Sequence, residues 1–590
     1  MRFTALREFL EYLERCDQLQ RITTEVDPEL EITEIAVRAL REGKPALLFE
    51  NVKGSPYPLA INVYASDRRI ELALGKHPDQ IGRELISFAE QMMPPSLKSI
   101  IAQRTMVRRL IAARPKDVTI AQSQEVVEHP DLSRLPILKC WPDDGGRFVT
   151  LPQVITYDPS NGHRNMGMYR MHVFDKCTTG MHWQIQKGGG FHYYQAERLH
   201  QPFEVAVALG TDPALLMATI AALPEGIDEA MFAGFLRGQG TPFVGGRSIS
   251  INVPANAEFV LEGLVAPKER RMEGPFGDHF GHYSAASEFP VFHVKTMTHR
   301  KNPIYPATVV GRPPMEDKFL GNATQQMLGP LVRTLHSEVR GLWAYHEAGF
   351  HNLLVVAIDE RYEKEAMKTA LGLMGTEQLS LTKCIITVSP DVDVRSFASV
   401  LRALRENFDP HIDFTMLPKV PLDTLDFTSF KMNLGSKMIL DATKKKGPAR
   451  RISGLKKVAA AIRRLPHLDR RVIDAVLVED TLGIIKVTKD GGPILRQFMA
   501  LPEFEELPLL AAVSDDVDIH SAESYIWGIF TRFDCERDVR FAQFRHIGIS
   551  PIYAGTMGID ATWKRGYPAA LTMDEKIVKK VEEKWDHYWR

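Results

Sequence analysis

Two short segments of this chain carry groups that could transfer a proton. Residues 273–279 read Glu-Gly-Pro-Phe-Gly-Asp-His, which places two carboxylates and an imidazole on one Gly-Pro bend. Residues 165–170 read Asn-Met-Gly-Met-Tyr-Arg and supply a carboxamide and a guanidinium. An acid that lies beside a second acid and a cation can hold a proton near neutral pH and deliver it to a reacting atom. Either segment alone is more typical of a turn with surface charges, but the pair indicates acid catalysis.

Hydrophobic patterns predict the elements that must position these residues. Residues 1–115 combine helical spacing with a short apolar run at Ala46–Phe49, which predicts an N-terminal α/β domain. Between residues 116 and 315, β-prone runs are divided by Gly and Pro, and both chemical segments fall in this β-rich middle. Between 316 and 445, two strand patterns flank a helical pattern and predict a C-terminal α/β domain. The expected fold class is therefore α/β (α+β).

The third region is followed by a partial copy of itself. Residues 388–393, Val-Ser-Pro-Asp-Val-Asp, recur as Val-Ser-Asp-Asp-Val-Asp at 513–518, and two further blocks recur in the same order. This repetition predicts a duplicated α/β module over residues 479–565, joined by a basic linker at 446–478. Chance similarity between two βα units is the alternative.

Amphipathic segments lie on either side of this module. The linker carries apolar residues at helical spacing, so it predicts a short basic helix that either packs on its own protein or touches an anionic membrane surface. The tail, residues 566–590, predicts a terminal helix with a capping box at Thr572 and Glu575. The apolar linker residues are Leu455, Val458, Ile462 and Leu465, and the tail stripe comprises Ile577, Val581, Trp585 and Tyr588.

Composition limits the classes of function. Of 590 residues, 25% are charged and 44% apolar, and the net charge of -1 gives no field that would attract nucleic acid. The five cysteines are odd in number and form no C-x-x-C pair, which favours a reducing compartment. We see no signal peptide and no apolar run of 18 residues. A cytoplasmic enzyme is expected, with peripheral contact at the inner face of the cell membrane left open.

The two chemical segments together resemble those of the UbiD-type decarboxylases, which use prenylated flavin mononucleotide (prenylated FMN). The resemblance implies a flavin-binding split β-barrel over residues 116–315 and a homo-oligomer whose tail helix contacts a neighbouring subunit. It also implies a flavin prenyltransferase as the supplier of the cofactor. Further matching segments lie at residues 26–28, 30–35, 45–51, 129–132, 140–142, 207–210, 232–238, 311–314, 434–438 and 441–443.

The resemblance gives the charged residues catalytic roles. Decarboxylation of an aromatic acid leaves two electrons on carbon, and no side chain is a good electron sink, so a cofactor is expected. Asp278 matches the family's proton donor, and Glu273 and Arg170 match its partners. A nearby carboxylate and burial would raise the pKa of Asp278, whereas Arg170 would oppose that change. An Asp at this position matches members that act on hydroxylated aromatic acids.

The resemblance also assigns residues to the cofactor. A divalent metal, Mn2+ or Mg2+, would bind Asn165 and Glu229, which offer hard oxygen ligands; Gln186 stands where many members have a histidine ligand, and K+ is a further candidate ion. Lys437 would reach the flavin phosphate. Thr556 replaces that lysine in the second copy, so the first module should hold the cofactor and the second should be scaffold. The flavin-lining positions match Met168, Tyr169, Arg170, His182, Trp183, Gln184, Lys187 and Gly188.

Segments at residues 315–328 and 343–352 resemble the menaquinone-biosynthesis (futalosine route) branch of the family. That branch implies decarboxylation of 1,4-dihydroxy-6-naphthoate, free or prenylated. The alternative within the family is polyprenyl-4-hydroxybenzoate on the route to ubiquinone. Alternatives of another class are an FMN-dependent oxidoreductase and a non-catalytic flavin-binding assembly protein, neither of which needs Asp278, Glu273 and Arg170 at one site.

Overall fold

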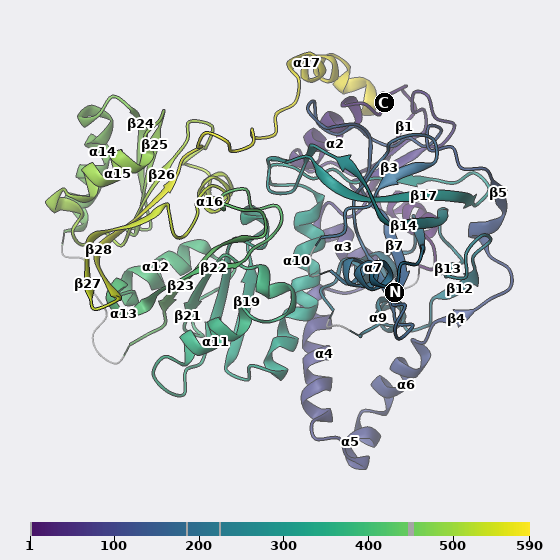
Figure 1. Cartoon of the computed structure of the whole chain (residues 1–590), viewed down its shortest axis with the longest axis horizontal. Helices are drawn as coiled ribbons and strands as arrows, with labels where there is room; N and C mark the ends of the chain where they lie inside the picture. Colours follow the sequence, from purple (N-terminus) through teal and green to yellow (C-terminus); the bar gives the residue numbers. More distant parts are fainter. Residues whose placement is uncertain (1–2, 185–186, 224–225, 446–453, 590) are drawn as a thin grey trace. The chain divides into compact units, whose positions relative to one another are not determined.

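The computed structural model describes residues 3–184, 187–223, 226–445 and 454–589. Within it the chain forms two compact units. Unit 1 combines Met1–Leu328 with Ala569–Arg590, and unit 2 is Gly329–Pro568 (Figure 1). The mixed α/β fold class that the sequence predicts is confirmed.

The N-terminal part of unit 1 is a four-stranded sheet covered by helices. Its strands follow the order β1-β2-β3-β18, with β18 contributed from far along the chain. The buried face of α1 carries Leu6, Phe9, Leu10 and Leu13, the helical spacing predicted from the sequence. The strands are β1 (Leu19–Ile22), β2 (Ala46–Phe49), β3 (Leu59–Ile61) and β18 (Tyr305–Pro306), and the helices are α1 (Leu6–Arg15), α2 (Glu31–Arg41) and α3 (Asp67–Leu74).

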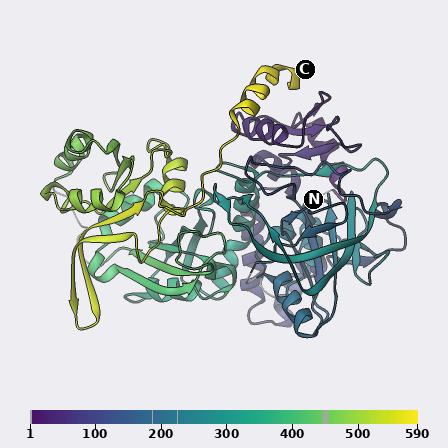
Figure 2. The same ribbon diagram turned by 45° about the horizontal axis from the view of Figure 1, so that its top comes forward.

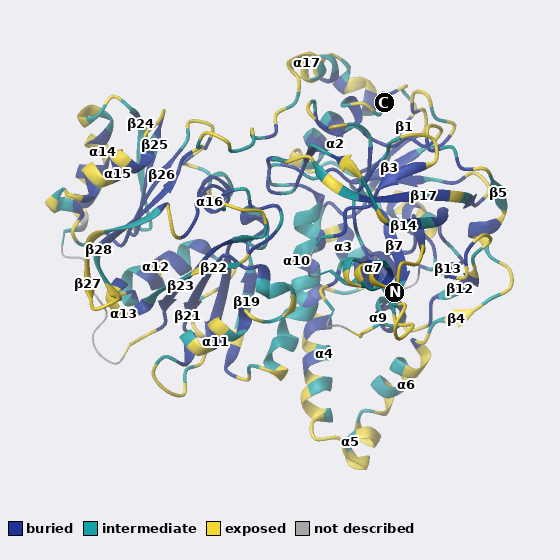
Figure 3. Ribbon diagram, viewed as in Figure 1, coloured by how far each residue is buried: buried dark blue, intermediate teal, exposed yellow. Residues whose placement is uncertain are grey.

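Three helices, α4 (Pro78–Met92), α5 (Leu97–Ala102) and α6 (Arg104–Ala112), form a projection from unit 1 in which α5 buries no residue (Figure 3). Helix α10 (Glu316–Leu328) packs against α4. Helix α10 buries Leu320, Ala323 and Met327 in the same core as α1, so it belongs to the first compact unit, which ends at Leu328.

The middle of unit 1 is a seven-stranded sheet whose pairs are all antiparallel. Its order is β10-β17-β14-β11-β7-β8, with β5 paired to β17. Strand β14 ends at Glu273 and β8 ends at Gly167, so each chemical segment continues the chain past the end of a strand of this sheet. The strands are β5 (Val126–Glu128), β7 (Gln153–Tyr157), β8 (Arg164–Gly167), β10 (Thr178–Gly180), β11 (Phe203–Leu209), β14 (Phe259–Glu273) and β17 (Ser287–His299); helices α7 (Gly188–Arg198), α8 (Pro213–Ile220) and α9 (Glu229–Arg237) accompany them.

Unit 2 holds two five-stranded sheets with the same strand order and the same pairing directions. The first module has β19 (Val339–Ala344), β20 (Leu354–Ile358), β21 (Cys384–Val388), β23 (Leu434–Ala442) and β22 (Phe414–Pro421), with α11 (Glu365–Leu373) and α12 (Phe397–Asn407). The second has β24 (Val472–Val478), β25 (Leu482–Val487), β26 (Leu509–Val513), β28 (Ser550–Ala561) and β27 (Val539–Ile547), with α14 (Leu455–Leu468), α15 (Gly491–Met499) and α16 (Ala522–Phe530).

Strand register agrees with the alignment of the two copies. Met438 pairs with Cys384 at the start of β21, and Met557 pairs with Leu509 at the start of β26. The residues that precede them, Lys437 and Thr556, are therefore equivalent.

The region predicted as a linker belongs largely to the second module. Strand β24 pairs with β25, and α14 buries Val458, Ile462 and Leu465 in the module's core. That apolar face is covered by the protein itself and is not available to a membrane. None of the helices in the described ranges is long and apolar enough to cross a membrane.

The tail packs on its own chain. Helix α17 (Glu575–Lys584) is capped by Asp574, which accepts a hydrogen bond from the Lys576 N–H, so the predicted capping box at Thr572 and Glu575 is wrong. Lys580 Nζ lies 2.8 Å from Glu31 Oε2 in α2, and Tyr588 Oη donates to Glu31 Oε1 at 3.2 Å. Val581, Trp585 and Tyr588 of the apolar stripe are buried in the core of unit 1, whereas the family resemblance implied a contact with a neighbouring subunit.

Candidate active site

Arg170, Glu273 and Asp278 converge in unit 1. Arg170 Nε donates to Glu273 Oε1 at 3.1 Å, and its Nη1 forms an ion pair with Asp278. Arg170 Nη2 donates to Ser284 Oγ at 3.0 Å, and the guanidinium lies 4.7 Å from the centre of the Phe276 ring. The Gly274-Pro275 bend turns the chain from β14 into the hairpin of β15 (Phe276–Gly277) and β16 (Tyr283–Ser284), which brings both acids to one arginine.

The charge of Asp278 is decided by its neighbours. Burial alone would raise the pKa of this carboxyl group, but Arg170 and His279 outweigh burial and hold the pKa well below its usual range. Asp278 Oδ1 accepts from the His279 N–H at 2.7 Å and faces His279 Nδ1 at 2.7 Å. Of the two opposing effects expected from the sequence, the cation therefore prevails, and Asp278 is ionised at neutral pH.

His182 is a partner of Glu273 that the sequence placed only on the flavin-lining surface. Its Nδ1 lies 2.7 Å from Glu273 Oε1. Burial lowers the pKa of His182, while His182 and Arg170 lower that of Glu273 against the effect of its own burial. An ionised carboxylate can only accept, so His182 Nδ1 carries the proton, and in the neutral ring Nε2 is left as an acceptor.

Three buried polar atoms near this cluster have no hydrogen-bond partner among the described residues. They are His182 Nε2, Trp183 Nε1 and Glu273 Oε2. A buried polar atom without a partner is costly, so such atoms indicate a missing ligand or water. Trp183 Nε1 is a donor and His182 Nε2 an acceptor, which suits the mixed polar edge of a flavin ring.

The start of α7 lies unusually close to the same residues. A Cβ on Gly188 would lie 2.1 Å from Asn165 Oδ1, and one on Gly189 would lie 2.7 Å from Trp183 Nε1. The Gly189 N–H also donates to Tyr169 Oη at 3.1 Å. Glycine is therefore required for this approach, and a helix N-terminus so placed can bind a phosphate. The residues present fit a flavin mononucleotide.

The predicted metal ligands Asn165 and Glu229 come from adjacent elements, β8 and the first residue of α9. The Met166 N–H donates to Glu229 Oε2 at 3.0 Å. Burial raises the pKa of Glu229 to about 7. A cation beside this carboxylate would offset that effect, and the oxygen ligands suit Mn2+ or Mg2+. Gln186 lies outside the described residues.

Asp144 is a supporting residue that the sequence did not reveal. Its Oδ1 accepts a hydrogen bond from the Gly277 N–H at 2.7 Å. Its Oδ2 accepts from the backbone N–H groups of Trp141 at 2.8 Å and Cys140 at 3.1 Å. Burial raises the pKa of Asp144 to about 6. Sequence alone could not reveal this role, because nothing local to Asp144 shows that it fixes Gly277, the residue preceding Asp278.

Residues 569–571 form backbone hydrogen bonds with the loop that follows Asp278. The Leu571 N–H donates to the Gly281 carbonyl at 2.9 Å, and the Tyr283 N–H donates to the Ala569 carbonyl at 3.4 Å. Residues 569–571 thus lie alongside residues 281–283, directly after Asp278.

The remaining flavin-binding predictions divide between the units. Met168 and Gln184 are half-buried in unit 1, and Lys187 precedes the first turn of α7. Lys437 lies in unit 2, where its Nζ donates to the Ser380 carbonyl and burial lowers its pKa to about 8. Contact between Lys437 and a phosphate stays a prediction.

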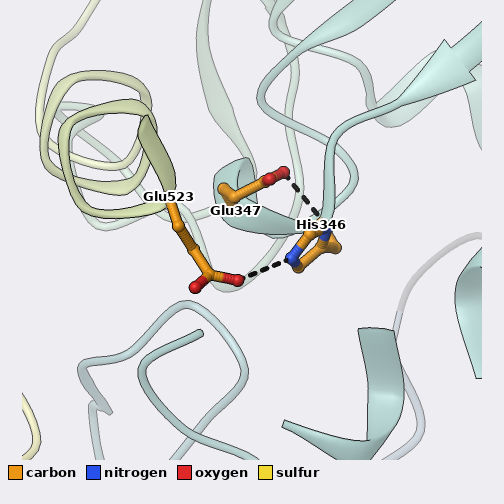
Figure 4. A group of neighbouring side chains, drawn as sticks. All are labelled: His346, Glu347 and Glu523. Atoms are coloured by element: carbon orange, nitrogen blue, oxygen red, sulfur yellow. Dashed lines mark hydrogen bonds and ion pairs between the residues drawn. The ribbon is translucent and has the colours of Figure 1, made fainter. Parts of the chain in front are cut away.

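A second group with metal-ligand side chains lies in unit 2 (Figure 4). His346 Nε2 is 3.2 Å from Glu523 Oε1, and His346 Nδ1 is 3.1 Å from Glu347 Oε2. His346 and Glu347 belong to the short helix η3 (His346–Ala348) of the first module, whereas Glu523 belongs to α16 of the second. These contacts therefore join the two modules.

Models of one family match three parts of the chain. They are described as the N-terminal, Rift-related and C-terminal domains of 3-octaprenyl-4-hydroxybenzoate carboxy-lyase (UbiD), and they match residues 10–89, 116–313 and 318–442. The matches stop at residue 442, so the second module lies beyond them.

Some relatives match nearly the whole chain, and others match about three quarters of it. A Chlamydia pneumoniae protein, named as one of the subunits of a 4-hydroxybenzoate decarboxylase, is 34% identical over 99% of this chain and 98% of its own length. An Archaeoglobus fulgidus protein is 45% identical over 75% of this chain and 92% of its own length. A quarter of this chain therefore has no counterpart in the second relative.

Solved structures resemble between 77% and 79% of the chain. The closed form of Sedimentibacter hydroxybenzoicus vanillic acid decarboxylase gives a TM-score of 0.68 at 26% identity, covering 79% of this chain and 99% of that one. The UbiD-class enzyme HmfF from Pelotomaculum thermopropionicum, in complex with FMN, gives 0.62 at 26% identity over 78% and 99%. An evolved dimeric form of HmfF in complex with prFMN gives 0.63 at 26% identity over 77% and 98%.

Proposed function

The chain belongs to the UbiD family of carboxy-lyases, and from that premise we propose that it decarboxylates a hydroxylated aromatic acid with prenylated FMN. The observation that carries the proposal is the buried convergence of Arg170, Glu273 and Asp278 beside unpartnered polar atoms of His182 and Trp183. Neither an FMN-dependent oxidoreductase nor a non-catalytic assembly protein would need this acid–cation cluster.

Prenylated FMN, when bound, would supply the electron sink that side chains lack. His182 Nε2 and Trp183 Nε1 would meet the polar edge of its ring, and the first turn of α7 would face its phosphate. Asn165 and Glu229 would hold a divalent cation, Mn2+ or Mg2+, with Lys437 as a further cation for the phosphate. A flavin prenyltransferase is the class of enzyme that would supply the cofactor.

Asp278 would gain its proton through competition for Arg170. The substrate carboxylate is an anion that can bind the same guanidinium. Once Arg170 is shared, burial would raise the pKa of Asp278, and the group would take up a proton. The C–C bond to the carboxylate breaks, CO2 leaves, and the proton held by Asp278 replaces it on the ring carbon. Glu273, fixed by His182, would hold Arg170 in place.

The substrate that we favour is 1,4-dihydroxy-6-naphthoate, free or prenylated, because of the segments that resemble the menaquinone branch. The second candidate is a 4-hydroxybenzoate, polyprenylated or not, and the name of the Chlamydia pneumoniae relative supports it.

The test compares turnover of the two acids by the same protein. The full chain is co-expressed with a flavin prenyltransferase, the mass of its flavin is measured, and CO2 release is followed with each acid. We expect prenylated FMN and faster turnover of the naphthoate. Faster turnover of 4-hydroxybenzoate would replace the substrate assignment, and unmodified FMN with hydride transfer would replace the reaction itself.

A further inference from the structure

A cavity lies wholly within unit 2, and its lining residues are not among those assigned above. Its volume is about 580 Å3, within the usual range for small-molecule sites. Its walls come from β22 in the first module and from α15, β27 and β28 in the second. The hairpin of β27 and β28 extends from its sheet (Figure 2). Most of the lining falls after residue 442, beyond the matched family domains.

Aromatic rings form one side of this cavity. Phe541 lies 4.9 Å from Phe414 and 4.5 Å from Tyr553, measured between ring centres, and Phe544 lies 5.6 Å from Tyr553. Phe544 is 55% exposed, although it is a large apolar ring that packing would normally cover. Met416 and Met499 add flexible apolar side chains that adapt to the shape of a ligand. The surface suits a flat ring or an alkyl chain.

Two arginines line the same cavity without carboxylate partners. Within the described ranges, neither Arg496 nor Arg540 has a carboxylate oxygen within 4.0 Å, and Arg540 Nε is buried with no hydrogen-bond partner. The lining also includes Glu536, which is exposed. A guanidinium that lines a cavity without a carboxylate partner, beside aromatic rings, can bind the carboxylate of a ligand.

The arginine is particular to the second copy. Phe541 pairs with Met557 and Met416 pairs with Met438, so the register makes Thr415 the first-module counterpart of Arg540. The second module thus has Thr556 where the first has Lys437. It carries a cation instead at Arg540, on strand β27, which lines the cavity.

We propose that this cavity binds an amphipathic aromatic carboxylate. Its ring would lie among Phe414, Phe541 and Tyr553, and its carboxylate would pair with Arg540, with Arg496 as a second cation. The proposal does not rest on the proposed function, because none of the residues that form this cavity has a role in it.

The experiment measures binding of 2-naphthoate to the full chain by calorimetry, with the neutral 2-naphthamide in parallel. We expect the full chain to bind two equivalents of 2-naphthoate. Arg170→Ala should abolish binding of one equivalent. Arg540→Gln should weaken the affinity for the other at least ~10-fold, because a charge-assisted hydrogen bond is removed. Ala542→Trp, an exposed lining position, should fill the cavity and abolish the second equivalent. The matched control is Arg545→Gln, which lies on the same strand outside the lining and should change nothing.

Binding of 2-naphthamide should be insensitive to Arg540→Gln. A single equivalent that disappears with Arg170→Ala would overturn the proposal. So would a second equivalent that is unchanged in both Arg540→Gln and Ala542→Trp. Dimerisation of the chain that Ala542→Trp abolishes, without naphthoate binding, would show that the cavity receives a second copy instead. If Arg540→Gln fails to fold, Arg496→Gln gives the same comparison.

Discussion

Asp278 carries a charge in the resting site although it must hold a proton during turnover. Arg170 and His279 keep its pKa low despite burial. We predict that Asp278→Asn folds and retains flavin but loses turnover at least ~100-fold, the usual scale for general acid catalysis. CO2 release by the purified variant measures turnover, and its flavin absorbance measures cofactor retention. Near-normal turnover would exclude Asp278 as the proton donor.

The partners of Asp278 should behave as one unit with it. Glu273→Gln and Arg170→Ala both remove the ion pair between these two residues, so their effects on turnover should not multiply in the double variant. Independent, multiplying losses would show that the two residues act separately.

Asp144 should make stability depend on pH. Burial raises its pKa from about 4 to about 6, so between these values the folded chain binds more protons than the unfolded chain. The free energy of unfolding of the wild type should therefore fall as the pH rises from 4 to 6, by up to about 3 kcal/mol relative to Asp144→Asn, which cannot titrate. Denaturant titrations of both proteins across this range measure the difference, and parallel curves would contradict the assignment.

At the scale of elements, β8 and the start of α9 should form the metal site. We predict that Glu229→Ala loses bound manganese and, with it, retained flavin. Metal analysis and flavin content after gel filtration test this together. Full flavin occupancy without metal would show that no metal links the protein to the phosphate. Gln186→His is the reverse test, because tighter metal binding would place residue 186 among the ligands.

The equivalent strands β23 and β28 should differ in cofactor binding. Lys437→Ala should weaken flavin retention, since a phosphate would lose a direct cation. Thr556→Ala is the matched control: Thr556 is buried and donates to the Phe504 carbonyl, as Lys437 does to the Ser380 carbonyl. Equal loss of flavin from both variants would mean that the second module also holds cofactor.

Local sequence predicted those elements whose signals are local. The apolar spacing of α1, the strand at Ala46–Phe49 and the βα pattern of the duplicate all depend on neighbouring residues. The role of Asp144 could not be predicted, because its partner Gly277 is 133 residues away. Convergence of Arg170, Glu273 and Asp278 was predicted only through family resemblance. The cap at Asp574 was missed because Thr572 and Glu575 also fit a capping pattern.

At the scale of the whole chain, the second module lies beyond the family domains that match this sequence. The matched domains end at residue 442, while the tail that completes unit 1 begins at Ala569. Sequence repetition revealed this insertion, but its limits required the structure, because α14 and β24 have linker-like composition and yet pack in the module.

The backbone hydrogen bonds between residues 569–571 and the loop that follows Asp278 have a consequence during protein synthesis. Residues 329–568, 240 in number, separate the two parts of unit 1, and at roughly 5–20 residues per second they take roughly 12–48 s to translate. Through that time Glu31 lacks Lys580 and Tyr588, and the loop after Asp278 lacks its neighbour. Chains stopped before Ala569 should release no CO2, a result that assays of chains truncated at successive codons would check. Catalysis would thus begin only after residues 569–571 have been synthesised.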